Sequence, residues 1–153
     1  GVSVGLVGSP PKAQQEAYNA GEGEDWLLAT TALIDLRGRT SLLELAGACQ
    51  QAAAVVSVDA GPMHIAAAVG TPTLAVVGND AAGVGASPIR LWLPRVAVLQ
   101  RTVSSSSCSA CADNRYRNDA CLVEGHPCMT GVEPEQVLSW LAQLPALRHR
   151  WAG

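Results

Sequence analysis

Residues 53–78 read AAVVSVDAGPMHIAAAVGTPTLAVVG, and this stretch decides the fold class. The β-branched apolar run at 53–58 predicts a buried strand. Gly61 and Pro62 then open a predicted helix, because proline is favoured in the first helical turn. A second apolar run at 73–77 predicts another strand. Strand, helix and strand in this order are typical of a βαβ unit, in which the two strands run parallel.

The same alternation extends in both directions. Ser41 and Glu44 form a capping-box pattern that opens a helix, and Gly70 closes the helix that follows Gly61. The predicted strands are continuous apolar runs, as in parallel strands buried on both faces. We therefore expect an α/β domain with a parallel sheet. The further predicted elements are strands at 2–7, 32–36 and 95–100, helices at 12–20 and 25–30, and a last helix at 133–145 with Val137, Leu138, Leu141 and Leu144 on its apolar face.

The bulk composition restricts the class of protein. The chain has 153 residues, which predicts about one domain, and 48% of them are hydrophobic. Charged residues make up 15% and the formal net charge is −3, so there is no basic character that would indicate nucleic-acid binding. No apolar run approaches the roughly 20 residues that span a bilayer. The chain enters a strand-like run directly after Gly1, from which we expect it to be a truncated part of a longer protein, with a tag remnant before a complete small domain as the alternative.

Three loops follow predicted strands, at residues 8–12, 59–64 and 78–80. Open α/β sheets bind ligands beyond the carboxyl ends of their strands. The loop at 59–64 runs directly into a helix, whose first N–H groups lack acceptors and, with the helix dipole, favour an anion such as a diphosphate. Gly61 lets the backbone approach a ligand, and His64 offers a donor. The alternative is structural: Asp59 caps the helix and His64 is an ordinary histidine.

Basic side chains occur near two of these strand ends. Lys12 follows the first loop and is placed to neutralise a phosphate, although a solvated helix lysine fits the same position. Arg37 and Arg39 flank Gly38 before the helix that starts at Ser41. Either arginine is suited to stacking on a base or pairing with a phosphate, and plain solvent exposure is the alternative.

Four of the five cysteines lie within residues 108–128, namely Cys108, Cys111, Cys121 and Cys128. One C-x-x-C pair with two further cysteines indicates a structural zinc site, with His126 as a spare ligand. The spacing lacks a second C-x-x-C pair, so disulfides and packed free thiols stay open as alternatives. We expect a cysteine-rich loop at 104–130.

Several segments resemble one known family. LRGRTSLLELA at 36–46 resembles L-x-G-K-T-S-L-x-E-L-A, and DAGPMHIAAAVGTP at 59–72 resembles N/D-D-S/T-G-P-M-H-L-A-A-A-L-G-T-P. GND at 78–80 stands where the family often has G-P-T-D, and the segments at 128–129 and 132–138 resemble C-M-x-x-I-S-P-E-E-V-L. These are motifs of glycosyltransferase family 9, the ADP-heptose:lipopolysaccharide heptosyltransferases and their relatives. The resemblance runs over roughly residues 2–144.

The resemblance implies a Rossmann-like three-layer domain that forms the C-terminal, nucleotide-sugar-binding half of a GT-B glycosyltransferase. Residues 1–153 would be a single partial domain, without the N-terminal acceptor domain and its catalytic base. Asp59 would contact the sugar, and Arg39 and Thr40 the nucleobase and ribose. The expected substrate-binding set is Asp59, Ala60, Gly61, Met63, His64, Arg39, Thr40, Lys12, Gly78 and Asp80.

The sequence departs from the family pattern at three positions. Ala60 replaces a serine or threonine, Pro10 falls near a ribose-binding glutamate of some heptosyltransferases, and Asn79 replaces a proline. These departures leave the nucleotide and the sugar open.

The resemblance implies inverting transfer from an ADP-heptose-like nucleotide-diphosphate sugar to a lipopolysaccharide-type, other glycan or lipid-linked acceptor. No cofactor is required, apart from the structural zinc considered above. We expect a bacterial protein of lipopolysaccharide biosynthesis, cytoplasmic or peripheral on the inner face of the inner membrane, and inactive as this chain alone. A non-catalytic nucleotide- or sugar-binding module and a zinc-clipped interaction domain are the alternatives.

Overall fold

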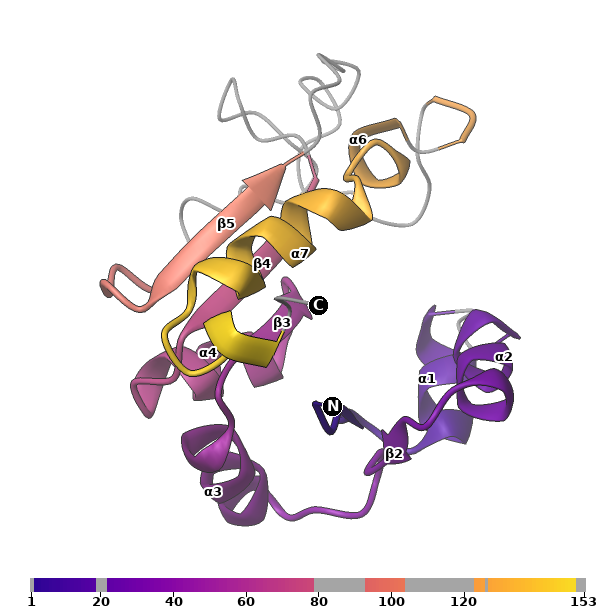
Figure 1. The fold of residues 1–153 in the computed structure, drawn as a ribbon. Helices are drawn as coiled ribbons and strands as arrows, with labels where there is room; N and C mark the ends of the chain where they lie inside the picture. The colour runs from indigo at the N-terminus through magenta and orange to yellow at the C-terminus, as the bar shows by residue number, and fades with distance from the viewer. Residues whose placement is uncertain (1, 19–21, 79–92, 104–122, 126, 151–153) are drawn as a thin grey trace. The chain divides into compact units, whose positions relative to one another are not determined.

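The computed structural model of the chain describes residues 2–18, 22–78, 93–103, 123–125 and 127–150. The chain divides into two compact units, residues 1–48 and 49–153 (Figure 1). The described helices are all too short or too polar to span a bilayer.

The first unit holds two parallel strands, β1 (Gly5–Leu6) and β2 (Ile34–Asp35), paired Gly5 with Ile34 and Leu6 with Asp35. The predicted strands are therefore present, but regular pairing is confined to two residues each. Val4 and Ile34 are 53% and 51% exposed, so the expectation of strands buried on both faces is wrong here. The helices of this unit are α1 (Pro11–Tyr18), α2 (Glu22–Thr30) and the first part of α3 (Leu42–Gln51).

The predicted capping box opens α3. The Ser41 amide donates to Glu44 Oε2 at 2.8 Å, and the Glu44 amide donates to Ser41 Oγ at 3.3 Å. Two N–H groups that have no partner within the helix are thereby satisfied. The hydrogen bonds from Ser41 hold the pKa of the Glu44 carboxyl below its usual value.

The second unit is built on a three-stranded parallel sheet in the order β3-β4-β5. Figure 1 shows the strands running in the same direction. Residues 73–77 form a strand with the predicted bounds, and this central strand is buried along most of its length. Along β3, by contrast, Val56 and Val58 are exposed, and as alternate residues of the strand they lie on the same face. The elements of the unit are β3 (Val55–Val58), α4 (Gly61–Ala68), β4 (Thr73–Val77), β5 (Leu99–Val103), α6 (Pro127–Thr130), α7 (Pro134–Gln143) and the 3₁₀ helix η2 (Arg148–Arg150).

The core of this unit lies between α4 and the sheet. Met63 and Ala67 of α4 pack with Ala75 and Val77 of β4 and with Leu99 of β5. The alanines allow close packing of the helix on the strands. Met63 is fully buried, which contributes about 1.5–3 kcal/mol to the free energy of unfolding.

The end of α4 confirms the role predicted for Gly70. Its φ is +81°, and its amide donates to Ala67 O at 3.2 Å while the Thr71 amide donates to Ala66 O at 3.0 Å. This pair of bonds is the Schellman motif, which favours glycine because the backbone is left-handed. The buried Thr71 hydroxyl then donates to Cys49 O at 2.6 Å, so the start of β4 is tied to the end of α3.

The last helix begins at Pro134, and the Glu133 amide before it donates to Gln136 Oε1 at 2.8 Å. Its buried residue is Trp140, whereas Leu138 is exposed. The predicted apolar face is therefore wrong in part. The tryptophan lies three residues after Val137, on the same helical stripe, and Leu138 lies beside that stripe.

Candidate functional site

The turn between β3 and α4 leads directly into the first turn of the helix. Ala60 is the N-cap residue, with extended backbone, and its methyl side chain provides no capping hydrogen bond. Pro62 in the first turn has no N–H, and the Met63 amide donates back to Ala60 O at 3.0 Å. The cap position that often carries a serine or aspartate acceptor thus offers none of its own.

Gly61 at the start of α4 is a glycine that the fold does not require. Its φ is not in the left-handed region, and a Cβ built on it meets no atom within 4 Å. Neither backbone conformation nor packing within the described residues therefore demands glycine here. The direction in which a side chain at this position would point is open.

Two polar side chains flank this open space. His64 Nε2 lies 3.9 Å from Asp59 Oδ1, with 43% of the histidine side chain and 30% of the aspartate side chain exposed. The separation is too long for a direct hydrogen bond. The imidazole and the carboxylate are thus neighbours across the turn, and both remain reachable from solvent.

Two other residues of the expected set, Met63 and Gly78, pack against other parts of the chain. Met63 lies wholly within the hydrophobic core, so its side chain supports the turn from beneath. Gly78 follows β4 and faces α6, where a Cβ would lie 3.4 Å from Cys128 Sγ and 3.6 Å from Met129 Sδ. The expected site residue Asp80 and the substituted Asn79 lie outside the described residues.

In the first unit, the loops that follow β1 and β2 meet. The Gly38 amide donates to Gly8 O at 2.9 Å, and the Arg39 amide donates to Leu36 O at 3.1 Å, closing a four-residue turn. Gly38 has φ +66° and lies against Pro10. This turn ends at Arg39, which is exposed.

Thr40, the next residue, is half-buried, and Lys12 is exposed in the first turn of α1, close after Pro10 in the chain. The structure thereby brings the start of α1, which carries Lys12, and the turn that ends at Arg39 to one end of the β1–β2 pair.

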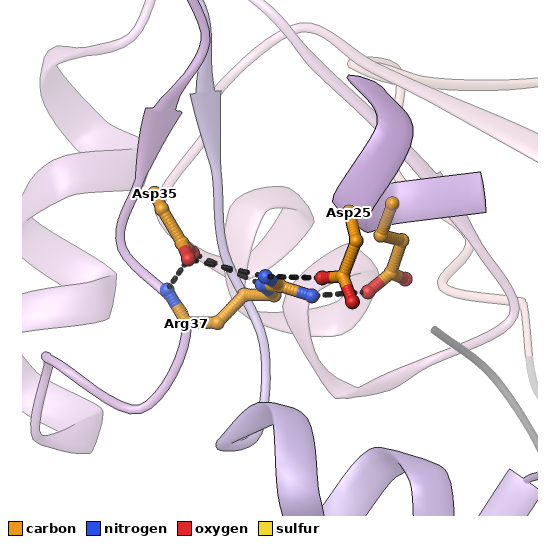
Figure 2. A network of polar contacts seen from close by, with 4 residues as sticks. Asp25, Asp35 and Arg37 are labelled. Atoms are coloured by element: carbon orange, nitrogen blue, oxygen red, sulfur yellow. Dashed lines mark hydrogen bonds and ion pairs between the residues drawn. The ribbon is translucent and has the colours of Figure 1, made fainter. Parts of the chain in front are cut away.

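Arg37 does not serve the role considered for it from the sequence. Its side chain is 3% exposed and makes ion pairs with Asp35, Glu24 and Asp25. Figure 2 shows Asp35 and Asp25 beside the guanidinium. Arg37 Nε and Nη2 donate to the two Asp35 oxygens at 3.0 and 3.1 Å, and Nη1 donates to Glu24 Oε2. A guanidinium held by carboxylates in this way is not available to stack on a base or to bind a phosphate, so that option is wrong for Arg37.

The network shifts the ionisation of its members. Hydrogen bonds from the Arg37 side chain and amide hold the pKa of Asp35 below its usual value. The Asp35 carboxylate, and to a smaller extent Glu24, raises the pKa of Arg37 beyond its already high value. Sequence reasoning missed the partners of Arg37. The signal was an aspartate two residues before an arginine at a strand end, with two acidic residues in the preceding helix.

The cysteine cluster is placed only in part. Cys108, Cys111, Cys121 and the spare ligand His126 lie outside the described residues. Cys128 is a half-buried free thiol in α6, beside Gly78. Within the described ranges no three metal-ligating side chains come together.

A family model described as glycosyltransferase family 9 (heptosyltransferase) matches residues 1–114. The chain belongs to glycosyltransferase family 9. The match spans three quarters of the chain and includes the turn at 36–39, the β3–α4 turn and all five described strands. Comparisons with curated proteins and with solved structures give no match.

Membership of a glycosyltransferase family agrees with the architecture. The parallel strands and connecting helices form the α/β arrangement of a Rossmann-like GT-B fold. In such folds ligands bind at the carboxyl ends of the strands. Both the β3–α4 turn and the turn at 36–39 of this family 9 chain lie at such ends.

Proposed function

We propose that this chain binds the nucleotide-diphosphate sugar donor of a heptosyltransferase-like glycosyl transfer. The observation that carries the proposal is the open start of α4, where Gly61 faces free space although neither its φ nor its packing requires glycine. A diphosphate suits this place, because N-terminal amides and the helix dipole favour negative charge.

Each residue of the turn has a proposed role. The main chain at Ala60 and Gly61 lines the approach of the phosphates. The half-exposed His64 donates to a phosphate or to a sugar hydroxyl, and Asp59 orients the hydroxyls of the sugar. Met63 keeps the helix start in place from the core.

The remaining members of the set serve the nucleoside and the charge of the donor. Arg39 and Thr40 contact the nucleobase and ribose, and Lys12 neutralises a phosphate. Gly78, which follows β4, and Asp80 border the sugar.

The proposed reaction is inverting transfer without a metal requirement. An acceptor hydroxyl attacks the anomeric carbon, the bond to the diphosphate breaks, and the nucleoside diphosphate leaves with the negative charge. Fixed dipoles at the start of α4 stabilise that charge as it develops. The base that takes the hydroxyl proton lies outside this chain, so we expect residues 1–153 alone to bind donor and transfer nothing.

The proposed acceptor is a lipopolysaccharide-type, other glycan or lipid-linked hydroxyl. The proposed setting is the bacterial cytoplasm or the inner face of the inner membrane. An ADP-heptose-like donor is the first candidate, although Ala60, Pro10 and Asn79 depart from the pattern of that donor's enzymes.

A thermal-shift panel of ADP-, GDP- and UDP-sugars tests the proposal. A ligand that binds the native state at 100 times its Kd stabilises it by about 2.7 kcal/mol. We expect one nucleotide class to raise the melting temperature of the chain, and His64→Ala to reduce that shift. No shift with any member at millimolar concentration would overturn donor binding.

A second candidate is a non-catalytic nucleotide- or sugar-binding module. The observation in its favour is Ala60, whose methyl group removes a hydroxyl donor from the turn. A transfer assay on the chain joined to an N-terminal acceptor domain separates the two, since a module binds donor but gives no product.

The zinc-clipped interaction domain predicts a different pair of results, namely one equivalent of zinc in the purified chain and no nucleotide-induced shift.

A further inference from the structure

Arg37 forms the most extensive polar network in the described part of the chain (Figure 2). Its guanidinium reaches both oxygens of Asp35 on β2 and one oxygen of Glu24 on α2, and Asp25 lies 3.7 Å from Nη2. With 3% of its side chain exposed, the arginine is almost fully withdrawn from water. Burial of a charge on this scale is stable because carboxylates pair with it and accept its hydrogen bonds.

The same network fixes the main chain of a turn. The Arg37 amide donates to Asp35 Oδ1 at 3.0 Å, so one carboxylate holds both the backbone and the side chain of Arg37. Arg37 is the second residue of the turn that the bond from the Arg39 amide to Leu36 O closes. Its conformation therefore sets the direction in which the chain continues to Arg39.

The opposite side of this turn is fixed by a separate contact. The Gly38 amide donates to Gly8 O, and Pro10 packs against Gly38. The turn is thus held from the α2 side by carboxylates and from the β1 side by the Gly8–Pro10 loop. With both sides restrained, exposed Arg39 leaves the turn in one defined place.

The carboxylates around Arg37 make its guanidinium group difficult to replace. One positive group lies among the three carboxylates of Glu24, Asp25 and Asp35. A neutral side chain at position 37 would leave the carboxylates to repel one another. A lysine would keep the charge but offers a single ammonium, which cannot hold both Asp35 oxygens and Glu24 in the fork geometry of arginine.

We propose that Arg37 is a positioning residue for nucleotide binding: through Asp35 and Glu24 it fixes the turn that presents Arg39 and Thr40 to the donor nucleoside. The inference rests on the proposed donor-binding function. Arg37 itself touches no ligand, because its side chain is 3% exposed and its guanidinium is held by carboxylates.

A double-mutant cycle tests the positioning role. The affinity of the full 153-residue chain for the tightest binder among ADP, GDP and UDP is measured by calorimetry for the wild type, Arg37→Gln, Arg39→Ala and the double variant, well below each melting temperature. We expect Arg39→Ala to weaken binding about tenfold, the loss of one charge-assisted contact. In the Arg37→Gln background the same change should cost less than twofold, because Arg39 is no longer held in place.

Two further variants, Glu24→Gln and Arg37→Lys, and the control Glu16→Gln keep the test valid if Arg37→Gln fails to fold. Glu24→Gln removes one partner of the network and should weaken nucleotide binding, while Glu16→Gln on exposed α1 should leave it unchanged. Compared with Arg37→Gln, Arg37→Lys should recover more of the stability of the fold than of the affinity for nucleotide. A cycle in which the two losses simply add, or equal effects of Glu24→Gln and Glu16→Gln, would overturn the positioning role.

Amide hydrogen exchange separates this inference from the proposed function. In Arg37→Gln the amides of Gly38 and Arg39 should exchange faster, whereas the Leu45 amide, which donates to Ser41 O, should keep its protection. This readout needs no ligand. If the wild type binds no nucleoside diphosphate, donor binding is refuted while the exchange data still decide whether Arg37 holds the turn. If binding is present but exchange at Gly38 is unchanged, the positioning role is refuted alone.

Discussion

Gly38 and Pro10 lie so close that a Cβ on Gly38 would stand 2.8 Å from Pro10 Cγ and 3.0 Å from Pro10 Cα. The contact joins the loop after β1 to the turn after β2. Glycine is therefore required here on two grounds, the positive φ of +66° and the proline against it.

Gly38→Ala should destabilise the chain by about 2 kcal/mol or more, because the left-handed backbone alone costs about 1–2 kcal/mol for an L-residue and the clash adds to it. The measurement is the free energy of unfolding in urea. Gly70→Ala is the matched control, since Gly70 has φ +81° but open space around a Cβ. If both variants lose the same stability, the Pro10 contact does not constrain the turn.

Gly61→Ala should separate binding from folding. The added methyl group would meet no other part of the chain within 4 Å, and φ is not left-handed. The free energy of unfolding should therefore stay the same or rise by about 0.4–1 kcal/mol. Nucleotide affinity should fall, because the methyl group occupies the space proposed for the diphosphate.

Gly47→Ala in α3 is the control for that substitution, as its Cβ also meets open space. It should stabilise the helix by about 1 kcal/mol and leave nucleotide affinity unchanged. Retained affinity in Gly61→Ala would show that the start of α4 does not hold the ligand.

Asp35 should make the stability of the chain sensitive to acid. Its pKa is lower in the folded chain than its usual 3.8 because Arg37 donates hydrogen bonds to it. A group with a depressed folded pKa contributes stability that is fully present above the unfolded value and is lost as pH falls through the folded one. Asp35→Asn should therefore be less stable than the wild type near neutral pH, and the difference should shrink as pH falls below 3.8.

Urea midpoints collected from pH 7 down to pH 3 measure this effect, in steps of about half a unit. Asp25→Asn serves as the comparison, because Asp25 is 75% exposed and lies 3.7 Å from the guanidinium. Its difference from the wild type should be small, because an exposed ion pair at this distance contributes little to stability. A constant gap for Asp35→Asn over the whole range would contradict the assigned hydrogen bonds.

Thr71→Val should cost about 1 kcal/mol, the typical net contribution of one hydrogen bond. The lost bond is that from the buried Thr71 hydroxyl to Cys49 O. The cost stays moderate because Cys49 O also accepts from the Ala52 amide at 3.1 Å. Thr71→Ser keeps the hydroxyl and should retain most of the stability. Equal losses in the two variants would assign the effect to packing instead of the hydrogen bond.

Local signals in the sequence predicted much of this chain. The strand at 73–77, the helix opened by Gly61 and Pro62, and the capping box at Ser41 all follow from chemistry within a few residues. Strand lengths at the N-terminus were overestimated, because an apolar run reports the tendency to be buried and not the number of residues that find a partner strand.

Side-chain roles depended on contacts that no short segment specifies. Arg37 and Arg39 look equivalent in the sequence. In the structure Arg37 pairs with Glu24, thirteen residues earlier, whereas Arg39 is exposed. Met63 stands within the motif expected to bind donor and proves to be the centre of the α4 core.

The alternation of strands and helices over residues 41–77, the capping box at Ser41 and the glycine end of α4 are properties of neighbouring residues, and the one-dimensional pattern was sufficient to find them. Which arginine is buried, which glycine is pressed against a proline and which apolar side chain fills the core depend on segments that meet only when the chain has folded. Sequence spacing does not encode those encounters directly, because they arise where loops from separate strands converge.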